Sequence, residues 1–88
     1  MRIIFHRRCD KDLERLKKAG WNMQPFEKFL HDCIHWPLPA KYEAHPLVGD
    51  RRGVWDIHIR QNWVVFLRKE GSSIKLLRTG THAELGIG

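Results

Sequence analysis

An aspartate and a histidine, Asp56 and His58, stand two residues apart in the segment VWDIHIR at positions 54–60. Apolar and polar residues alternate along this segment, which predicts a β-strand with one buried and one polar face. The side chains of Asp56 and His58 would then project from the polar face about 6.6–7 Å apart. Histidine exchanges protons near neutral pH, so the pair is a candidate site for general acid–base chemistry. A solvated polar face with no chemical role would show the same pattern.

Three more residues of the second half of the chain could complete such a site. Arg78 is expected near the end of a later strand, and its guanidinium group suits bidentate contact with a phosphate. His82 follows in a turn where Gly80 permits unusual backbone angles, and His45 lies in a proline-rich loop. Three histidines and an arginine, with no serine or cysteine nucleophile nearby, suit acid–base cleavage of a phosphodiester. RNA needs no external nucleophile in that reaction, because its own 2′-hydroxyl group can attack.

Residues 31–35 offer a competing metal chemistry. His31 and His35 stand one helical turn apart and could bridge a metal ion. Cys33, between them in the sequence, belongs to the apolar stripe of the predicted helix and cannot readily join them. We therefore interpret both histidines as surface residues and expect neither a metal nor another cofactor.

The first 20 residues predict a short strand at residues 2–6 and an amphipathic helix after it. Cys9, Leu13 and Leu16 recur at spacings of four and three, which is typical of the apolar seam of a helix. Gly20 is expected to end this helix, because glycine adopts the backbone angles that helix ends require.

A second helix is predicted from about Asn22 to His35, with Asn22 as its N-cap and Pro25 in its first turn. Its apolar stripe consists of Phe26, Phe29, Leu30, Cys33 and Ile34. Pro37 and Pro39 would end the helix. The short connection between the two helices predicts a helical hairpin laid on a sheet.

The second half of the chain changes to a period of two. Residues 37–53 are rich in proline and glycine and predict an ordered loop with extended pieces. A meander of three strands is expected to follow, at residues 54–60, 62–69 and 73–80. The middle strand is apolar on both faces, which favours a central position in the sheet. In the last strand, alternation places Ile74, Leu76 and Arg78 on one face.

Composition limits the classes of protein that this chain could represent. It has 88 residues, a formal net charge of +6 and 42% hydrophobic residues, so we expect a single folded domain over residues 1–88. No run approaches the roughly 18 apolar residues of a membrane span, and no secretory signal is recognisable. Cys9 and Cys33 form no CxxC motif, so both are expected to be reduced in a cytoplasmic protein. The positive charge favours a polyanionic partner such as a nucleic acid.

Three motifs within residues 38–85 occur together. LPxxYxxHxLxG is present as LPAKYEAHPLVG, GxxDxHI as GVWDIHI with a tryptophan a few residues on, and LxRTGTH as LLRTGTH. In this combination the chain resembles the YafQ-type toxins of the RelE/ParE superfamily, and the first 37 residues match that family in layout. The resemblance implies an α+β fold, in which an N-terminal helical hairpin packs on one face of a small twisted, mostly antiparallel sheet.

The resemblance also implies a function and partners. YafQ-type toxins are ribosome-dependent endoribonucleases that cut messenger RNA, so the implied activity is that of a metal-independent mRNA interferase. The implied partners are a cognate antitoxin, the 70S ribosome and messenger RNA. Operator DNA would be bound only through the antitoxin, and no membrane is involved.

Matched residue by residue, the catalytic histidines of the family fall on His45, His58 and His82. The phosphate-binding arginine falls on Arg78, and the acidic residue before the strand histidine falls on Asp56. His82 would be the general acid, and either His45 or His58 the general base. Further substrate contacts are expected from Lys41, Asn62 and Trp63.

Two positions depart from the family pattern. Asn62 stands before Trp63 where the family usually has aspartate, and an amide cannot take up a proton at ordinary pH. Gly86 follows Leu85 where the family tends to have a phenylalanine that could stack on a base. These departures motivate an alternative, a RelE-fold module with weak or no nuclease activity that acts mainly in a toxin–antitoxin complex regulating transcription. A gyrase-directed toxin of the ParE branch ranks third, because it would not need the three histidines together.

Overall fold

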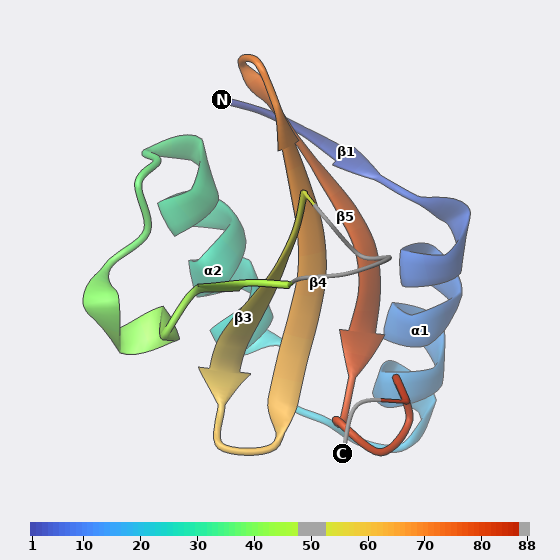
Figure 1. Ribbon diagram of the computed structural model, residues 1–88. Helices are drawn as coiled ribbons and strands as arrows, with labels where there is room; N and C mark the ends of the chain where they lie inside the picture. The colour runs from blue at the N-terminus through green and yellow to red at the C-terminus, as the bar shows by residue number, and fades with distance from the viewer. Residues whose placement is uncertain (48–52, 87–88) are drawn as a thin grey trace.

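The structure is a computed structural model that describes residues 1–47 and 53–86. Within these residues, two α-helices and five strands follow one another, with a short 3₁₀ helix after the second α-helix (Figure 1). In chain order they are β1 (Arg2–Phe5), α1 (Arg7–Lys18), α2 (Gln24–Ile34), η1 (Ala40–Tyr42), β2 (His45–Pro46), β3 (Val54–Arg60), β4 (Trp63–Glu70) and β5 (Ser73–Gly80).

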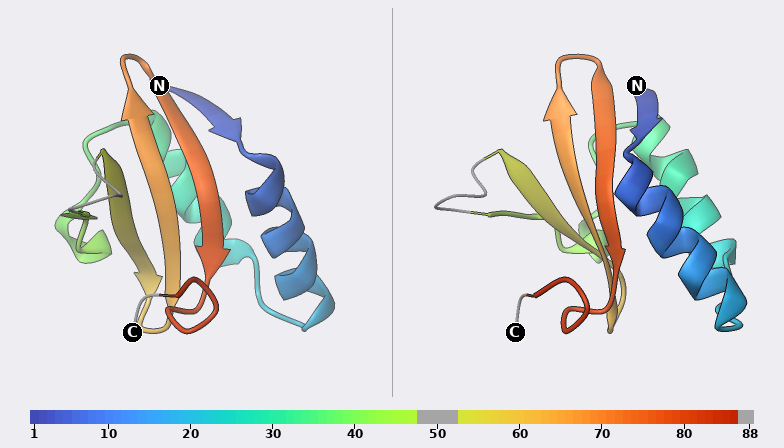
Figure 2. Two further views of the ribbon diagram at one scale, coloured as in Figure 1. Left: turned by 45° about the vertical axis from the view of Figure 1, so that its right-hand side comes forward. Right: turned by 90° about the vertical axis from the view of Figure 1, so that its right-hand side faces the viewer.

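The strands form one mixed sheet in the order β1-β5-β4-β3-β2. β1 pairs with β5 in parallel, and the other neighbouring strands are antiparallel. α1 packs against β5, whereas α2 packs against β1 and β3. Both helices lie on the same side of the sheet, which Figure 2 shows edge-on in its right panel. The predicted α+β fold is therefore confirmed, and the C-terminal turn packs on the opposite face of the sheet.

The end of the first strand and the start of the second helix differ slightly from their predicted positions because of local capping. β1 ends one residue early, since the ring of His6 accepts a hydrogen bond from the backbone N–H of Arg8 (3.0 Å) and caps α1. α2 begins at Gln24, and the side-chain oxygen of Asn22 accepts the N–H of Gln24 (3.0 Å) from outside the helix. Gly20 follows α1 with a φ of +87°, as a helix-ending glycine should. Neither of these helices is long and apolar enough to cross a membrane.

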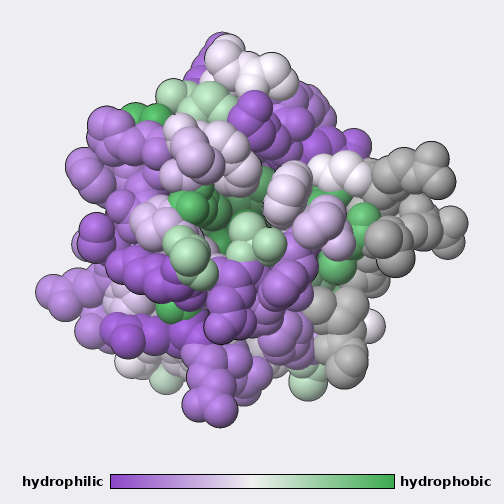
Figure 3. Space-filling view, turned by 60° about the vertical axis from the view of Figure 1, so that its left-hand side comes forward, coloured by the Kyte–Doolittle hydropathy of each residue, from purple (hydrophilic) through white to green (hydrophobic). Residues whose placement is uncertain are grey.

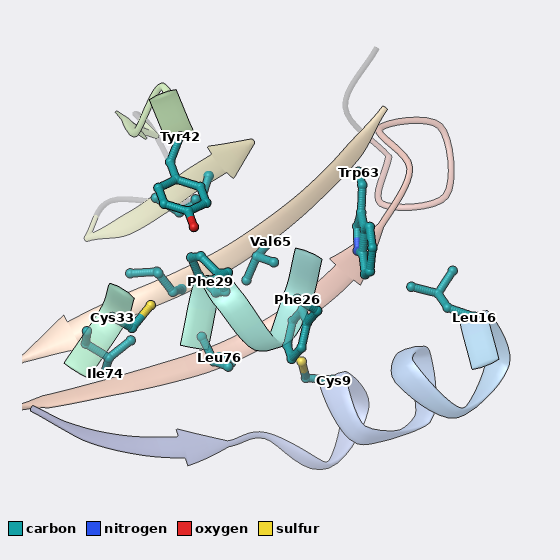
Figure 4. Close-up of a cluster of buried hydrophobic side chains, with 12 residues drawn as sticks. Cys9, Leu16, Phe26, Phe29, Cys33, Tyr42, Trp63, Val65, Ile74 and Leu76 are labelled. Carbon is teal, nitrogen blue, oxygen red and sulfur yellow. The ribbon is translucent and has the colours of Figure 1, made fainter. Parts of the chain in front are cut away.

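The main core lies between the helices and the sheet. Trp63 at the start of β4 stacks on Phe26 of α2, with ring centroids 6.1 Å apart and planes 14° apart. Trp21 meets the edge of Trp63 at 5.1 Å. Figure 4 shows Phe26 and Trp63 together with Phe29, Tyr42 and the two cysteines over the central strands. Trp63 and the next four residues are all buried, which confirms that β4 is the central strand.

A smaller apolar cluster lies on the other face of the sheet. It consists of Val54, Val64, Phe66 and Leu85. Leu85 comes from the C-terminal turn, so burying its side chain ties that turn to the sheet. The surface around these elements is mostly hydrophilic, and on the face seen in Figure 3 hydrophilic residues surround a hollowed apolar centre.

Both cysteines are fully buried and free. Burial raises the pKa of each thiol to about 12, and the carboxylate of Asp12 adds to this rise at Cys9. Because the thiolate is the reactive form, we expect Cys9 and Cys33 to resist a disulfide-exchange reagent such as DTNB in the native protein at pH 8. Both should react at once in 6 M guanidinium chloride, roughly a full denaturing concentration for such a domain. Fast reaction of either thiol in the native state would contradict this packing.

Candidate active site

Three predicted site residues lie in one row that crosses four strands on the outer face of the sheet. His45 of β2 pairs with Asp56 of β3, Asp56 pairs with Phe66 of β4, and Phe66 pairs with Arg78 of β5. Directly opposed residues of paired strands project from the same face. The row thus places His45, Asp56 and Arg78 on one face of the sheet, with Phe66 between Asp56 and Arg78.

Arg78 reaches this face because of a β-bulge. Simple alternation predicts Arg78 on the same face as Ile74 and Leu76, and this prediction is wrong. The pairing of β4 with β5 shifts beside Phe66, so that Leu77 is an extra residue in β5. A bulge redirects the side chains that follow it. Ile74 and Leu76 therefore lie in the main core, whereas Arg78 lines a hollow on the outer face with Phe66 and Leu77.

The carboxylate of Asp56 lies between two histidine rings. Its Oδ2 is 3.8 Å from Nε2 of His58 and 3.7 Å from Nε2 of His82. The side chain of Asp56 is 11% exposed, against 21% for His58 and 32% for His82. The other carboxylate oxygen, Oδ1, is buried and has no hydrogen-bond partner in the part of the chain that the structure describes. A buried carboxylate with an unused acceptor is costly for folding, which marks this position as a candidate for chemistry.

The imidazole rings form a contiguous group. The ring of His58 lies 5.8 Å from that of His45 and 5.2 Å from that of His82, measured between centroids. Nδ1 of His58 is 3.3 Å from the carbonyl oxygen of Glu43, a residue in the left-handed conformation (φ 44°) just after η1. When Nδ1 carries the proton it donates to that carbonyl, and Nε2 is then the unprotonated nitrogen that faces Asp56. Sequence reasoning missed this contact, because a backbone carbonyl leaves no signal in the residue type.

The turn that carries His82 is held by a capping box. The backbone N–H of Thr81 donates to Glu84 Oε1 (2.8 Å), and the N–H of Glu84 donates to Thr81 Oγ1 (3.1 Å). Arg15 of α1 also donates from Nε to Glu84 Oε2 (3.1 Å), so the turn is tied to the helix. The predicted need for glycine at position 80 is confirmed: its φ is +153°, and a Cβ there would lie 2.8 Å from the Glu84 carboxylate.

Arg78 is held by a buried acid of α1 that the sequence interpretation overlooked. Asp12, whose side chain is 4% exposed, accepts hydrogen bonds from Arg78 Nε (2.7 Å) and Nη2 (3.1 Å). It also accepts from Arg15 Nη1 (2.8 Å) and from the backbone N–H of Thr79 (3.0 Å). Burial alone would raise the pKa of Asp12, but the hydrogen bonds from Arg78 and Arg15 outweigh it and lower the pKa below its ordinary value. The sequence contained one indication of this role: Asp12 is a polar residue three positions after Cys9, which places it on the buried side of the helix.

The three other predicted substrate residues lie in different surroundings. Lys41 is exposed and lines a hollow together with His58 and His82. Asn62 is exposed in the turn between β3 and β4. Trp63 is only 4% exposed, and its Nε1 donates to Thr79 Oγ1 (2.9 Å) beneath the sheet. Its side chain thus supports the strand that carries Arg78 instead of facing the site.

Two overlapping groups of these residues have the donor atoms to hold a metal ion. They are Glu43, His45 and His58, and Asp56, His58 and His82, with ligand atoms within 4.8 Å of one another in each group. The pair first considered for a metal, His31 and His35, lies on the far side of the sheet near the end of α2, with ring centroids 5.1 Å apart. Cys33 is fully buried, as expected, and cannot join that pair.

Comparison with known proteins assigns this chain to a family. A model of the family described as "Bacterial toxin of type II toxin-antitoxin system, YafQ" matches residues 1–86. The chain belongs to the YafQ toxin family. The mRNA interferase toxin YafQ of Escherichia coli K12 is 41% identical over 85 residues, which are 94% of this chain and 92% of the relative. The resemblance that the motifs of residues 38–85 indicated is therefore confirmed, and it extends over the helical N-terminal part.

Solved YafQ structures agree with the fold described above. The crystal structure of YafQ from E. coli BL21(DE3) superposes with a TM-score of 0.88 at 28% identity, covering 97% of this chain and 98% of that one. YafQ in the E. coli DinJ–YafQ toxin–antitoxin complex superposes with a TM-score of 0.85 at 30% identity, covering 94% and 93%. Our chain is thus a type II toxin by family, with an antitoxin as the partner class of that family.

Proposed function

We propose that this protein is an mRNA interferase, an endoribonuclease that cuts messenger RNA on the ribosome by histidine acid–base catalysis. The observation that carries the proposal is the Asp56 carboxylate, whose Oδ2 lies 3.7–3.8 Å from the Nε2 atoms of His58 and His82. A carboxylate beside two histidines suits a reaction that removes one proton and delivers another, because it stabilises whichever ring becomes positively charged. Homologues named mRNA interferase toxin support the same activity.

In the proposed reaction, Nε2 of His58 takes the proton of the ribose 2′-hydroxyl group. The resulting oxygen attacks the adjacent phosphorus and forms a 2′,3′-cyclic phosphate, while the bond from phosphorus to the 5′-oxygen breaks. His82 donates a proton to that leaving oxygen. His58 is preferred to His45 as the base because the carbonyl of Glu43 can hold its Nδ1–H and leave Nε2 free.

Charge that develops on the phosphate would be stabilised by Arg78. Its side chain is 30% exposed, so part of the guanidinium can meet the substrate while Asp12 holds the remainder. His45 is exposed beside His58 and would contact the same phosphate. Asp56 attracts whichever of His58 and His82 is protonated. It therefore assists both the removal of a proton by His58 and the delivery of a proton by His82. Each of these steps is performed by a side chain, so the mechanism requires no metal ion.

The proposed partners follow from charge and family. With a net charge of +6, the protein is attracted to the RNA of the ribosome and to the message in its decoding site. A cognate antitoxin would restrain the toxin in the cytoplasm, as DinJ forms a complex with YafQ in E. coli. Operator DNA would be reached through that antitoxin.

The test uses purified protein, 70S ribosomes and a defined message, with 5′ ends mapped by primer extension. We expect cuts on ribosome-bound message only, and a single 2′-deoxynucleotide before the cut should block cleavage, since it removes the nucleophile. Absence of cleavage by the wild type, or equal cleavage by His82→Ala, would contradict the proposal. In the first case, sustained bacterial growth with the soluble chain expressed alone would favour the non-enzymatic alternative that Asn62 suggests.

A further inference from the structure

Three adjoining hollows run from the histidines across the end of β3. The first, about 430 Å³, is lined by His58, His82, Lys41 and Arg60 among others. The second, about 460 Å³, shares Lys41 and Arg60 with it. The third, about 400 Å³, shares Arg60 with both and ends at Trp21. Each hollow shares lining residues with the next, and we call the three adjoining hollows together the Arg60 groove.

The groove is positively charged. Arg60 is exposed, and its side chain makes no hydrogen bond or ion pair within residues 1–47 and 53–86. Lys41 stands beside it, and Lys28 lines the second hollow, where it is paired with Asp32 (3.3 Å). Among the described residues that line the three hollows, Glu43 is the only carboxylate. Cations along a groove that has few carboxylates are suited to the phosphates of a nucleic-acid strand.

The far end of the groove has the side chains of a base-binding site. Trp21 is half-buried and held edge-on against Trp63, so its ring is fixed in place. The amides of Asn22 and Asn62 flank it. The oxygen of Asn22 already accepts the N–H of Gln24, which leaves its NH₂ group to donate to a ligand. Figure 1 shows that the connection between α1 and α2 and the turn between β3 and β4 lie at the same end of the molecule. Unpaired RNA bases are recognised by such aromatic and amide groups.

We propose that the Arg60 groove binds the message strand on one side of the scissile phosphate. Arg60 contacts a backbone phosphate, and the hollow beside Trp21 receives an unstacked base. The occupant is the message, because the first hollow contains His58 and His82 and a strand lying there is the one to be cut. This inference rests on the proposed function and adds to it the residues that would set sequence preference.

The phosphate contact is tested with Arg60→Gln on programmed ribosomes. Loss of one charged hydrogen bond should raise KM by roughly 10-fold with kcat little changed. The slope of log KM against log salt should fall by about one, as expected for one lost phosphate contact. Arg60→Lys should recover most of the loss. Arg2→Gln is the matched control, since Arg2 is an exposed arginine on β1, at the opposite edge of the sheet, and should leave KM unchanged. If the wild type cleaves and Arg60→Gln has the same KM and the same salt slope, the proposed binding of the message in the groove is overturned.

The base contact is tested with Asn22→Ser, which keeps an oxygen for the N–H of Gln24 and removes the amide donors. We expect a changed distribution of cut sites on a randomised message, with melting temperature close to that of the wild type. An identical distribution would overturn the base site.

A third measurement separates the groove from the nuclease. Message carrying 4-thiouridine near the cut is bound to ribosomes with the inactive His82→Ala variant and irradiated. Crosslinks to peptides containing Trp21 or Arg60 would support the groove even if no cleavage were ever found. If neither peptide is crosslinked and the protein instead protects ribosomal RNA, the groove is assigned to ribosomal RNA and the proposal is overturned.

Discussion

Replacing Asp56 by asparagine is expected to lower ribosomal cleavage by roughly 10²–10⁴-fold and to leave the folded protein at least as stable as the wild type. The loss of activity follows because the carboxylate is the only negative group of the described residues that lies between Nε2 of His58 and Nε2 of His82. An amide of the same shape cannot balance the positive charge that forms on each ring in turn.

The stability of this variant should not fall, because the wild-type carboxylate is poorly satisfied. Oδ1 of Asp56 is buried without a hydrogen-bond partner among the described residues, and such a group costs about 1–3 kcal/mol. A neutral side chain removes the buried charge and part of that cost. Single-turnover cleavage on ribosomes and urea denaturation at pH 7 measure the two effects separately.

Asp32 provides the matched control for Asp56. Its carboxylate accepts hydrogen bonds from Tyr42 and Lys28 on the helical side of the sheet, away from the histidines. The hydrogen bond from Tyr42 lowers the pKa of Asp32, so the charged form stabilises the fold. Asp32→Asn should therefore lose stability by about 1 kcal/mol and keep the rate of the chemical step at saturating protein, the reverse of the effect at Asp56. If Asp56→Asn cleaved normally, Asp56 would have no part in the chemistry.

The local pattern was sufficient to predict the centre of the site. Alternation in β3 placed Asp56 and His58 on the outer face, and the motifs placed His45 and His82 near them. It failed at Arg78, because the register of β5 against β4 shifts at Leu77, and the alternation of residues along β5 alone does not reveal that shift. At position 78 the residue type indicated a phosphate-binding role, whereas strict alternation predicted the wrong face of the sheet.

The residues that hold the site were harder to predict than the residues that form it. Asp12 lies 66 residues before Arg78 in the chain, and the charge pattern of α1 alone gave it no special status. Its place on the apolar seam was the only local signal. Thr81 and Glu84 did show the spacing of a capping box, which could have predicted a fixed turn around His82. The family motif predicted that Trp63 contacts the substrate. Its side chain is instead buried in the main core, because β4 is the central strand and is apolar on both faces.

The buried carboxylate of Asp12 is the other position where a large effect is expected. Asp12→Ala removes the acceptor shared by Arg78, Arg15 and the N–H of Thr79. Breaking a buried ion pair in this way costs 3–5 kcal/mol, and both arginines can turn partly to solvent, so we expect a loss of about 3 kcal/mol. For a chain of this size that lowers the melting temperature by roughly 10–20 °C. Cleavage should fall as well, since Arg78 loses its fixed orientation.

The pH dependence of stability distinguishes this ionic role from simple packing. The pKa of Asp12 is lower in the folded state, so its contribution to stability is complete above its unfolded pKa of about 3.9 and is lost as the pH falls further. Asp12→Asn keeps the shape and cannot titrate. The free energy of unfolding should therefore drop less between pH 5 and pH 2.5 in this variant than in the wild type, within the roughly pH 5 to pH 1 window of such a linkage. Glu84 and Asp32 also have lowered pKa values, so the drop should shrink without vanishing. An equal drop in both proteins would mean that Asp12 holds Arg78 by shape, and the charge on α1 would then have no part in positioning the phosphate-binding arginine.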